Sequence, residues 1–478
     1  MKKGEIYTGI VTKLLFPNKG IAECEPYEID GKITESEKCV VKNVIPGQII
    51  RFRVTKKRHG ECEGILIDVV KKADSEIIPN CSHFGKCGGC AYQSLSYENQ
   101  LKIKEEQVFE LLCPTVKYDL RDQKIYAGIK ESPKRFGYKN KMEFSFGDEF
   151  KGGELNLGLH KKGSFYDIVD VSGCQIVCED IRKIVDAVLV TARNQKLTFF
   201  HKVQHTGLLR HLVVRRSEST GDILVMLVTT SYEKFDIDVF TKSLKNLKLD
   251  GQISGFLHCI NDSPADTVKA DELKTVFGQD FFYESVLGLK FKVTPFSFFQ
   301  TNTFGAEVLY KTARDFVTDA IGEVNGEKPV IFDLYSGTGT ITQLLSPVAK
   351  HVYGVEIVDE AVKSAVENVK LNGLTNCSFL TGDVLKVLDE IEEKPDFIVL
   401  DPPRDGVHPT ALKKIINYNV KNMIYISCKP TSLARDLPVL HAAGYEVKRL
   451  AMVDMFPWTA NVETCVLLTK SNDSADRV

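Results

Sequence analysis

The sequence has no long apolar stretch. No segment of its 478 residues approaches the roughly 18 consecutive apolar residues that mark a transmembrane helix. The amino-terminal residues from Met1 to Ile6 also lack the apolar core that a secretion signal carries behind its charged start. We therefore expect a protein without a membrane span or a secretion signal, located in the cytoplasm.

The sequence also lacks a strong charge of one sign, an internal repeat and any low-complexity tract. Lys and Arg total 62 against 64 Asp and Glu, which gives a net charge of -2. With 43% hydrophobic and 26% charged residues, the composition is that of a soluble globular protein. The near-neutral sum does not by itself indicate a nucleic-acid partner, although it can conceal a local basic patch. The length allows about three domains, and we expect a monomer.

Cysteine is plentiful, with 13 residues in the chain. Because we expect no export, metal-binding or catalytic thiols are favoured over disulfides. Cys81, Cys87 and Cys90 form a C-x5-C-x2-C group, in which neighbouring thiolates repel each other unless a cation or a cluster neutralises them. A fourth ligand is needed, and the candidates are Cys174, Cys178, Cys113 and His83. An iron–sulfur cluster on four cysteines fits as well as zinc or better, because zinc usually takes two C-x2-C pairs and only one is present.

Residues 1–72 contain short runs of alternating polarity separated by glycines, a pattern typical of a small β-barrel. The run from Arg51 to His59 concentrates basic side chains. It is either a phosphate-binding stripe or a charged edge strand. The module resembles a TRAM domain, the small OB-like barrel that binds RNA in several RNA-modifying enzymes.

Residues 73–290 predict a mixed α+β central domain. A helical pattern runs from Leu95 to Leu112, and we expect the helix near 95–125 to pack on the catalytic domain. The runs 207–216 and 222–230 predict an antiparallel hairpin. Its basic residues are expected on the surface or facing RNA: Arg210, His211, Arg215 and Arg216.

From residue 291 to 478 strands and helices alternate, which indicates an α/β, doubly wound domain. The glycine-rich loop Gly337-Thr-Gly339 suits both dinucleotides and S-adenosylmethionine, and Glu356 ends the next strand where it could accept ribose hydroxyls. The order of this loop, Glu356, Asp383 and Asp401-Pro-Pro resembles the class I (Rossmann-like) methyltransferase fold. That resemblance implies that these residues bind S-adenosylmethionine: Gln300, Tyr335, Gly337, Thr340, Glu356, Asp383 and Asp401.

Cys428 follows the short apolar run from Ile424 to Ser427, which predicts a buried strand with a polar tip, and Glu463 lies further along the chain. Five segments match, in order, the RNA uridine C5-methyltransferase family: Ser297-Phe-Phe-Gln300-Thr-Asn302, Asp333-Leu-Tyr335-Ser-Gly-Thr-Gly339, Asp401-Pro-Pro-Arg404-Asp-Gly406, Ser427-Cys428-Lys-Pro430, and Phe456-Pro457 to Val462-Glu463-Thr464. The cysteines Cys81, Cys87, Cys90 and Cys174 resemble the iron–sulfur branch of that family, which implies a [4Fe-4S] cluster. The resemblance further implies an RNA substrate, with 23S rRNA favoured over tRNA.

Chemistry explains these residue types. Thiolate addition at C6 of uracil makes C5 nucleophilic, and a base must then remove the C5 proton so that the thiol can leave. The resemblance assigns Cys428 as the nucleophile and Glu463 as the base. A paired target uridine would have to leave its stack to reach the thiol. The chain departs from the family at Lys429, which could lower the pKa of the thiol or contact phosphate, and at Asn461.

Three alternatives remain open at this level. A non-catalytic RNA-binding protein could keep the methyltransferase fold as a platform, but both reacting residues are present. An amino-methyltransferase would want an aromatic residue at the position of Arg404. A radical S-adenosylmethionine enzyme would want three residues, rather than five, between the first two cysteines of its group.

Overall fold

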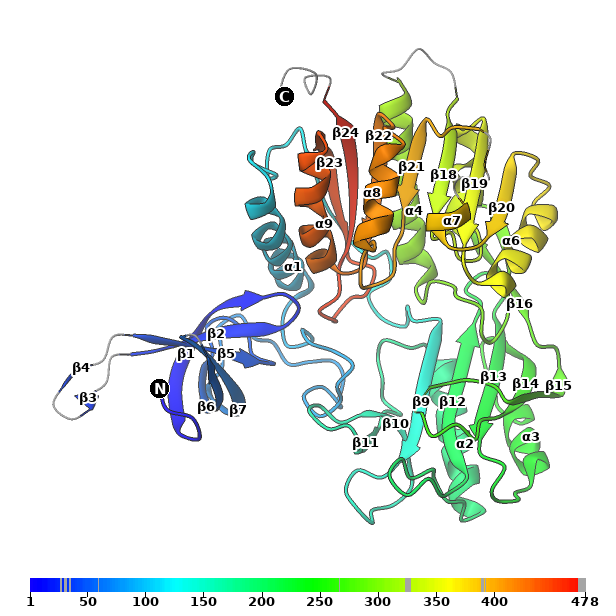
Figure 1. Ribbon diagram of the computed structural model, residues 1–478. Coiled ribbons are helices and arrows are strands. Elements are labelled where there is room, and N and C mark those ends of the chain that lie inside the picture. The colour runs from blue at the N-terminus through cyan, green and yellow to red at the C-terminus, as the bar shows by residue number, and fades with distance from the viewer. Residues whose placement is uncertain are drawn as a thin grey trace.

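The structure is a computed structural model with three bodies: an amino-terminal barrel, a large sheet with helices on both faces, and a second mixed sheet beside it (Figure 1). It describes residues 1–478 except 26–27, 30–31, 34–35, 59, 266, 323–327, 388–390, 392 and 472–478. The mixed α/β fold with a strand-rich amino-terminal part agrees with the predicted fold class.

Five strands near the amino terminus form a closed barrel in the order β1-β2-β5-β7-β6. Their bounds are β1 Ile6–Leu15, β2 Lys19–Cys24, β5 Glu37–Lys42, β6 Ile49–Arg58 and β7 Glu61–Lys71, and a separate short hairpin consists of β3 Glu28–Ile29 and β4 Lys32–Ile33. Side chains of alternating residues, such as Ala22 and Phe52, fill the barrel interior.

The basic run of the barrel lies on β6, except for His59, which is outside the described residues. Strand β6 pairs with β1 on one side and with β7 on the other. The edge-strand interpretation of this run is therefore wrong. Arg51 forms an ion pair with Asp68, so part of the positive charge of the run is offset. A phosphate-binding role for the remaining basic residues stays a prediction.

A seven-stranded sheet in the order β11-β10-β9-β12-β13-β14-β15 forms the second body. Its elements are β9 Lys141–Gly147, β10 Asn156–His160, β11 Ile168–Asp170, β12 Leu209–Arg216, β13 Asp222–Thr229, β14 Gln252–Ile260 and β15 Glu272–Gly278, with helices α2 Glu179–Asn194 and α3 Ile237–Lys245. The predicted antiparallel hairpin is confirmed as β12 and β13.

Three of the four basic side chains of that hairpin do not lie on the surface, whereas Arg216 is partly exposed. Arg210 and Arg215 are 3% and 2% exposed, and His211 is also buried, so the expectation of an exposed or RNA-facing hairpin is wrong for these three residues. The guanidinium of Arg210 donates to the carbonyls of Asn261, Ser263 and Ala265. The guanidinium of Arg215 donates to carbonyls at 294, 295 and 297, so backbone oxygens of neighbouring loops accept hydrogen bonds from each buried guanidinium.

The large sheet has eight strands in the order β20-β19-β18-β21-β22-β24-β23-β8. The strands are β8 Tyr126–Lys130, β18 Val330–Leu334, β19 His351–Glu356, β20 Cys377–Thr381, β21 Phe397–Leu400, β22 Asn422–Ser427, β23 Tyr445–Val453 and β24 Glu463–Lys470. Strands β18 to β22 run parallel, whereas β24 is antiparallel to both β22 and β23. The chain order reverses between β18 and β21, which is where a doubly wound sheet opens a crevice for ligands.

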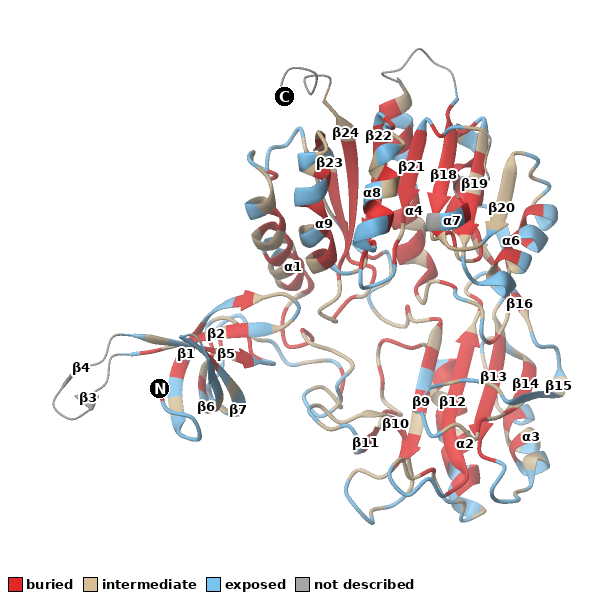
Figure 2. Cartoon of the chain, viewed as in Figure 1, coloured by how far each residue is buried: buried red, intermediate tan, exposed pale blue. Residues whose placement is uncertain are grey.

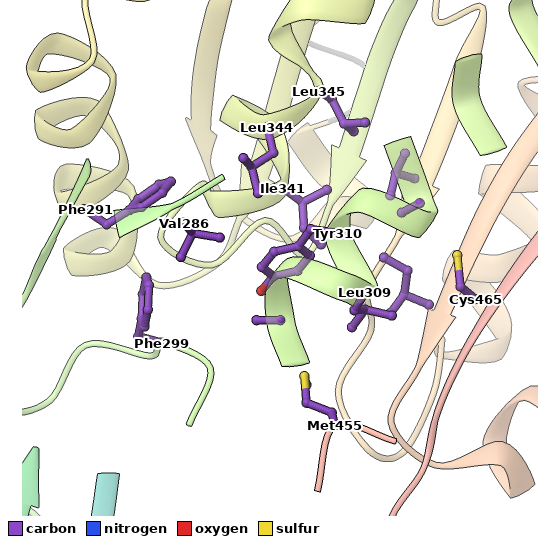
Figure 3. Close-up of a cluster of buried hydrophobic side chains, with 14 of the residues drawn as sticks. Val286, Phe291, Phe299, Leu309, Tyr310, Ile341, Leu344, Leu345, Met455 and Cys465 are labelled. Atoms are coloured by element: carbon purple, nitrogen blue, oxygen red, sulfur yellow. The ribbon is translucent and has the colours of Figure 1, made fainter. Parts of the chain in front are cut away.

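Successive side chains along the strands of this sheet pack into two separate hydrophobic cores, one on each face. Ile331, Val399 and Ile424 point to the face covered by helix α4 Thr303–Gly322. Figure 3 shows this core around Tyr310 and Leu309. Their strand neighbours point to the opposite face, toward α1 Tyr97–Leu112, α8 Pro409–Asn417 and α9 Pro430–Ala442. Both faces are therefore covered, and the strands β18, β21, β22 and β24 are buried nearly throughout (Figure 2). The edge strands β8 and β20 are only partly buried.

The remaining elements of this region are short or lie at its edges. They are η1 Cys113–Thr115, the hairpin β16 Phe282–Val286 and β17 Leu289–Val293, α5 Thr340–Leu345, η2 Ser346–Val348, α6 Asp359–Leu371 and α7 Val384–Val387. No helix within the described part of the chain is long and apolar enough to cross a bilayer.

Segments from before residue 130 join the large sheet. Helix α1 packs beside α9, with Val108 and Leu112 in the same core as the sheet. Strand β8 adds a parallel edge next to β23. The expected packing of the first helix on this body is therefore seen. The division into 1–72, 73–290 and 291–478 stays a prediction, with the segment 97–130 structurally part of the last body.

Candidate active site and cysteine site

A cavity of about 1040 Å³ opens at the carboxyl ends of β18, β19, β21 and β22, where the chain order of the sheet reverses. Sites for small molecules usually measure about 300–1,000 Å³, so this cavity has room for a cofactor and for part of a second ligand. Most of the predicted cofactor-binding and catalytic residues line it: Gln300, Tyr335, Gly337, Thr340, Glu356, Asp401, Cys428 and Glu463.

One half of the cavity is built by the loop after β18. Tyr335 has a positive φ of 68°, and the amides of Tyr335 and Ser336 donate to the carbonyl of Val355. Gly337 also has a positive φ, and a Cβ added there would meet only Phe298 within 4 Å, so the backbone stays open to the cavity. This loop leaves space for a ligand to approach the main chain.

Glu356 is held in place by the same loop. The amide of Gly337 donates to its Oε2 at 3.0 Å, and the amide of Val358 donates to its Oε1 at 2.9 Å. An ionised carboxylate offers about four lone-pair sites, so two remain for hydroxyl donors of a ligand. Nearby, the Oγ of Ser336 is buried and has no hydrogen-bond partner within the described part of the chain, although the residue lines the cavity. An oriented carboxylate and an unsatisfied hydroxyl fit a polar cofactor with ribose hydroxyls.

Asp383 is the one predicted cofactor residue that does not line the cavity. It follows β20, and its negative charge contributes to the raised pKa of Tyr335, whose main cause is burial. It therefore lies near Tyr335, and a contact with the cofactor stays a prediction.

In the sequence analysis, Asp333 is named only as the first residue of the glycine-rich motif. In the structure its side chain is fully buried beneath the loop. Thr342 donates to its Oδ2 at 2.5 Å, while Oδ1 has no partner among the described residues. Burial raises its pKa to about 7, and the charge of Asp401 adds to the shift. Asp333, the first residue of the motif, thus packs beneath the loop and stabilises it.

The other half of the cavity holds the thiol of Cys428 and the carboxyl groups of Glu463 and Asp401. Cys428 follows β22 directly, Glu463 opens β24, and Asp401 follows β21. The pairing of Ser427 with Thr464 makes Cys428 and Glu463 the next residues across the two strands. The antiparallel register therefore brings a thiol and a carboxyl group to one end of the sheet.

Burial changes the acidity of all three groups. It raises the pKa of Cys428 to about 11, with further upward contributions from the charges of Glu463 and Asp401. It raises the pKa of Glu463 to about 8, with Asp401 adding to the shift, and that of Asp401 to about 7. A carboxyl group with a pKa near the ambient pH is suited to accept a proton in catalysis.

Arg404 is the cation that opposes these shifts. Its charge lowers the pKa of both Cys428 and Glu463, and its side chain is exposed at the mouth of the cavity. In the sequence analysis, Arg404 is named only within a family segment and as a departure from the amino-methyltransferase motif, and no effect of Arg404 on the thiol is expected. Lys429, which was expected to act on the thiol or on phosphate, is exposed at the start of α9, and its role stays a prediction.

Aromatic residues complete the cavity wall, and sequence reasoning did not single them out as site residues. Phe296 and Phe298 are 44% and 66% exposed, an unusual state for large apolar side chains, and Tyr310 and Phe456 lie deeper. The only available signal was their place inside or near the quoted motifs. Flat apolar walls of this kind are suited to stacking a planar base.

The second predicted site lies in the cysteine-rich segment. Cys81, Cys87, Cys90 and Cys174 line one small cavity, and His83 lines it as well. Cys113 and Cys178, two of the other candidate ligands, do not. Among the described residues no three His, Cys, Asp or Glu side chains come close enough together to bind a single metal ion. An iron–sulfur cluster needs no such convergence, because each thiolate binds a different iron.

The surroundings of these thiols suit anions. The amide of Gly89 donates to Cys87 Sγ at 3.3 Å, and Gln93 Nε2 donates to Cys90 Sγ at 3.3 Å. Burial raises the pKa of Cys90 to about 12 and that of Cys174 to about 11. Four ionised thiols could be held here only with a positively charged partner, because burial disfavours the charged form. The donor set therefore fits a cationic cluster.

Known structures share this fold. The tRNA (uracil-54, C5)-methyltransferase of Pyrococcus abyssi, solved in complex with S-adenosyl-L-homocysteine, superposes with a TM-score of 0.73 at 23% identity, over 97% of this chain and 100% of that one. The fold is that of an S-adenosylmethionine-dependent methyltransferase, as the order of the strand ends indicated.

The sequence comparisons define the class further. Residues 96–471 match the family described as tRNA (Uracil-5-)-methyltransferase. An uncharacterized RNA methyltransferase of Clostridium tetani is 44% identical over 472 residues, 99% of both chains, and one of Clostridium acetobutylicum is 45% identical over 474 residues, 98% of this chain and 99% of that one. The chain belongs to the tRNA (uracil-5-)-methyltransferase family. It is therefore a methyltransferase enzyme, and the non-catalytic alternative is not supported.

Proposed function

We propose that the chain transfers a methyl group from S-adenosylmethionine to C5 of a uridine in RNA, with 23S rRNA as the target. The observation that carries this proposal is the meeting of Cys428, Glu463 and Asp401 with a glycine-rich loop in a single cavity. A thiol and a proton-accepting carboxyl group are what C5 methylation of uracil needs, whereas amino-methylation needs neither.

Bound S-adenosylmethionine supplies an electrophilic methyl group. Glu356 would hold its ribose through the lone pairs that the loop amides leave free, and Ser336 would donate or accept through its unsatisfied hydroxyl. The amino-acid part would lie against the loop at Gly337. We propose the following residues for this half of the site: Gln300, Tyr335, Thr340, Asp383 and Asp401.

Cys428 is proposed to act first. Its sulfur bonds to C6 of the target uracil, and the electron pair of the C5–C6 double bond moves through C5 toward the C4 carbonyl oxygen. C5 would then take the methyl group while its bond to the sulfonium sulfur breaks and S-adenosylhomocysteine leaves, and C5 would keep its own proton for the next step. The raised pKa of Cys428 means that the thiolate forms only at a cost, which the positive charge of Arg404 reduces.

Glu463 is proposed to act second. Its carboxylate takes the proton from methylated C5, the C5–C6 double bond re-forms, and the bond from C6 to the sulfur of Cys428 breaks. A pKa of about 8 allows Glu463 to exchange protons near neutral pH. Because Glu463 is 4% exposed, water has little access to this step.

RNA recognition is assigned to the barrel and to the aromatic wall of the cavity. A uridine turned out of its stack would enter between Phe296, Phe298 and Phe456. Ribosomal RNA is proposed because the barrel and the four cysteines resemble the ribosomal branch of the family. Transfer RNA is the second candidate, since the matching family description names it.

The four cysteines Cys81, Cys87, Cys90 and Cys174 are proposed to hold a [4Fe-4S] cluster with a structural role. The support is their shared cavity and the N–H donors aimed at two of the sulfurs.

The decisive experiment supplies the purified protein with methyl-labelled S-adenosylmethionine and either 23S rRNA or a tRNA pool that lacks 5-methyluridine. Label should appear at C5 of uridine in the rRNA. Label confined to tRNA would replace the proposed target, and label at another atom or base would overturn the proposed reaction. Mapping 5-methyluridine in RNA from a strain without the protein then identifies the position.

A further inference from the structure

The connection between β23 and β24 carries Phe456, which lines the cavity, and leads within a few residues to Glu463. Four consecutive carbonyls of this connection, those of Met455, Phe456, Pro457 and Trp458, accept hydrogen bonds from residues outside the two strands. The donors are Asn302 Nδ2 at 2.6 Å, Lys104 Nζ at 3.2 Å, Tyr138 Oη at 3.0 Å, and the amides of Ala91 and Tyr92 at 2.8 and 2.9 Å, respectively.

Trp458 is held most tightly of the four. Its amide donates to Gln100 Oε1 at 2.8 Å and its indole Nε1 donates to the carbonyl of Arg135 at 2.7 Å. The ring is 6% exposed and stacks on Phe136 at 4.9 Å. Its φ of 68° is unfavourable for a bulky residue, so the surrounding contacts must stabilise this conformation.

The donors to Pro457 and Trp458 belong to the surroundings of the cysteine site. Ala91 and Tyr92 follow Cys90 directly in the chain. Gln93 ties this stretch together, since its Nε2 donates to Cys90 Sγ and its Oε1 accepts from the amide of Cys81. The phenol of Tyr138 lies close enough to Cys90 and Cys174 for their charges to add to the effect of burial on its pKa.

We infer that the cysteine-bearing loop, through the amides of Ala91 and Tyr92, acts together with Tyr138 to position the catalytic base. These donors hold the carbonyls of Trp458 and Pro457 and thereby fix Phe456 and Glu463. Tyr138 and Gln100 are positioning residues in this arrangement, since neither lines the cavity. The inference rests on the proposed role of Glu463. A general base must stay within hydrogen-bond reach of the proton it removes, and a misplacement of about 1 Å can cost roughly 100-fold in rate.

The chain provides its own probe of this connection. Trp458 is the single tryptophan among the 478 residues. Its emission maximum therefore reports on this one segment without any labelling, and the buried, stacked ring should emit at short wavelength. Release of the segment into water should shift the maximum to longer wavelength.

Two substitutions test the inference without touching the cavity. Tyr138→Phe removes the hydroxyl that donates to Pro457 while keeping the ring, and Gln100→Leu removes the acceptor for the Trp458 amide. The matched control is Tyr445→Phe, which removes an equally buried hydroxyl bonded at 2.7 Å to the carbonyl of Val420, far from the connection. All three are studied as the full-length protein with its metal content measured.

We expect both test variants to shift the Trp458 emission to longer wavelength and to lower kcat about tenfold. The KM for RNA and the affinity for S-adenosylhomocysteine should change less than twofold, because no cavity residue is altered. Methylated RNA covalently attached to the protein should accumulate, since the step assigned to Glu463 is the slow one. Tyr445→Phe should show none of these changes.

Other outcomes distinguish a failure of the positioning role from a failure of the proposed function. Unchanged emission and turnover in both variants, while Glu463→Gln still accumulates the attached RNA, would overturn the positioning role and leave the reaction intact. Equal losses in the two variants and in Tyr445→Phe, with a matching fall in melting temperature, would also overturn it, because a general loss of stability would then explain the effect. Failure of the unaltered protein to methylate any uridine would instead reject the proposed function.

Discussion

Cys428 and Glu463 lie opposite each other at the ends of two neighbouring antiparallel strands, β22 and β24. Ser427 pairs with Thr464 immediately beside them, and the hydroxyl of Thr464 donates to the carbonyl of Ser427 at 3.2 Å. A shift of one residue in this register would turn one of the two side chains to the other face of the sheet. The strand pairing thus holds together two groups whose proposed actions are separated in time.

Replacing Cys428 by alanine should abolish both methylation and covalent attachment of RNA, because no other thiol lines the cavity. Attachment is measured as a protein–RNA species that survives denaturing electrophoresis. Cys465→Ala, which removes a buried thiol of β24 outside the cavity wall, serves as the control and should retain activity. Methylation of uridine C5 by the Cys428 variant would contradict the covalent mechanism.

Replacing Glu463 by glutamine should leave thiol attack and methyl transfer possible but slow the removal of the C5 proton. The variant should accumulate a protein–RNA species that carries the transferred methyl group, with steady-state turnover reduced about 100-fold or more. The measurement is the amount of labelled methyl group that migrates with the protein on a denaturing gel. Normal turnover of this variant would mean that another group is the base.

Removing the Asp401 carboxyl should make the stability of the ligand-free protein depend less on pH. Burial raises the pKa of Asp401 to about 7 and that of Glu463 to about 8, above their values in an unfolded chain. The folded state therefore binds more protons than the unfolded state between about pH 4 and pH 8, and the stabilisation is lost as pH rises through the folded-state values. Asp401→Asn should accordingly gain melting temperature relative to the unaltered protein at about pH 8.5 but little at about pH 5.

The control for that comparison is Asp315→Asn, which alters an exposed carboxylate paired with Lys311. It should show no trend of this kind. A difference in melting temperature that is the same at both pH values for Asp401→Asn would contradict the burial of an ionisable carboxyl group at this position.

The cysteine site should contain iron and sulfide. Protein purified without oxygen should be brown, with iron and acid-labile sulfide in equal amounts. Cys90→Ser should lose both, whereas Cys178→Ser should keep them because Cys178 does not line the cavity. Stoichiometric zinc without sulfide would contradict the assignment, and turnover that depends on an electron donor would contradict a structural role.

The cofactor half of the site should depend on Glu356. Glu356→Gln should weaken the binding of S-adenosylhomocysteine roughly 10- to 100-fold, since hydrogen bonds to a charged group contribute about 1.5–3 kcal/mol. Calorimetric titration measures this, with Glu367→Gln as the control because that glutamate lies on the exposed face of α6 and pairs with Lys292. Binding of NAD in place of S-adenosylhomocysteine would contradict the cofactor assignment.

Local features of the sequence determined much of the fold. Gly337, Gly339 and Glu356 indicated the half of the cavity that is expected to bind the cofactor. They could be found in the sequence because the loop and the acidic strand end lie close together in the chain. The apolar run Val330-Ile-Phe332 forms β18, whose side chains are buried on both faces of the sheet. The spacing of Cys81, Cys87 and Cys90 likewise indicated one shared site.

Charge patterns were a poorer guide, because the direction of a side chain depends on what packs against its strand. Arg210 and Arg215 read as surface residues, yet loops from residues 261–265 and 294–297 supply the carbonyls that make their burial possible. Those loops are distant in sequence, and the residues next to the arginines do not predict that the loops pack against them.

Only the tertiary structure decided how distant segments meet. It brings Cys174 to the other three cysteines, places β8 beside β23, and sets Ala91 and Tyr92 against the carbonyl of Trp458. It also decides the acidity of Glu463, because the burial and the neighbouring charge of Asp401 come from different strands. The sequence by itself suggested the candidate reacting groups, since the chemistry proposed for them resides in single residues. The tertiary structure determined the surroundings of these groups, because burial and the electrostatic field depend on all the residues packed around a group.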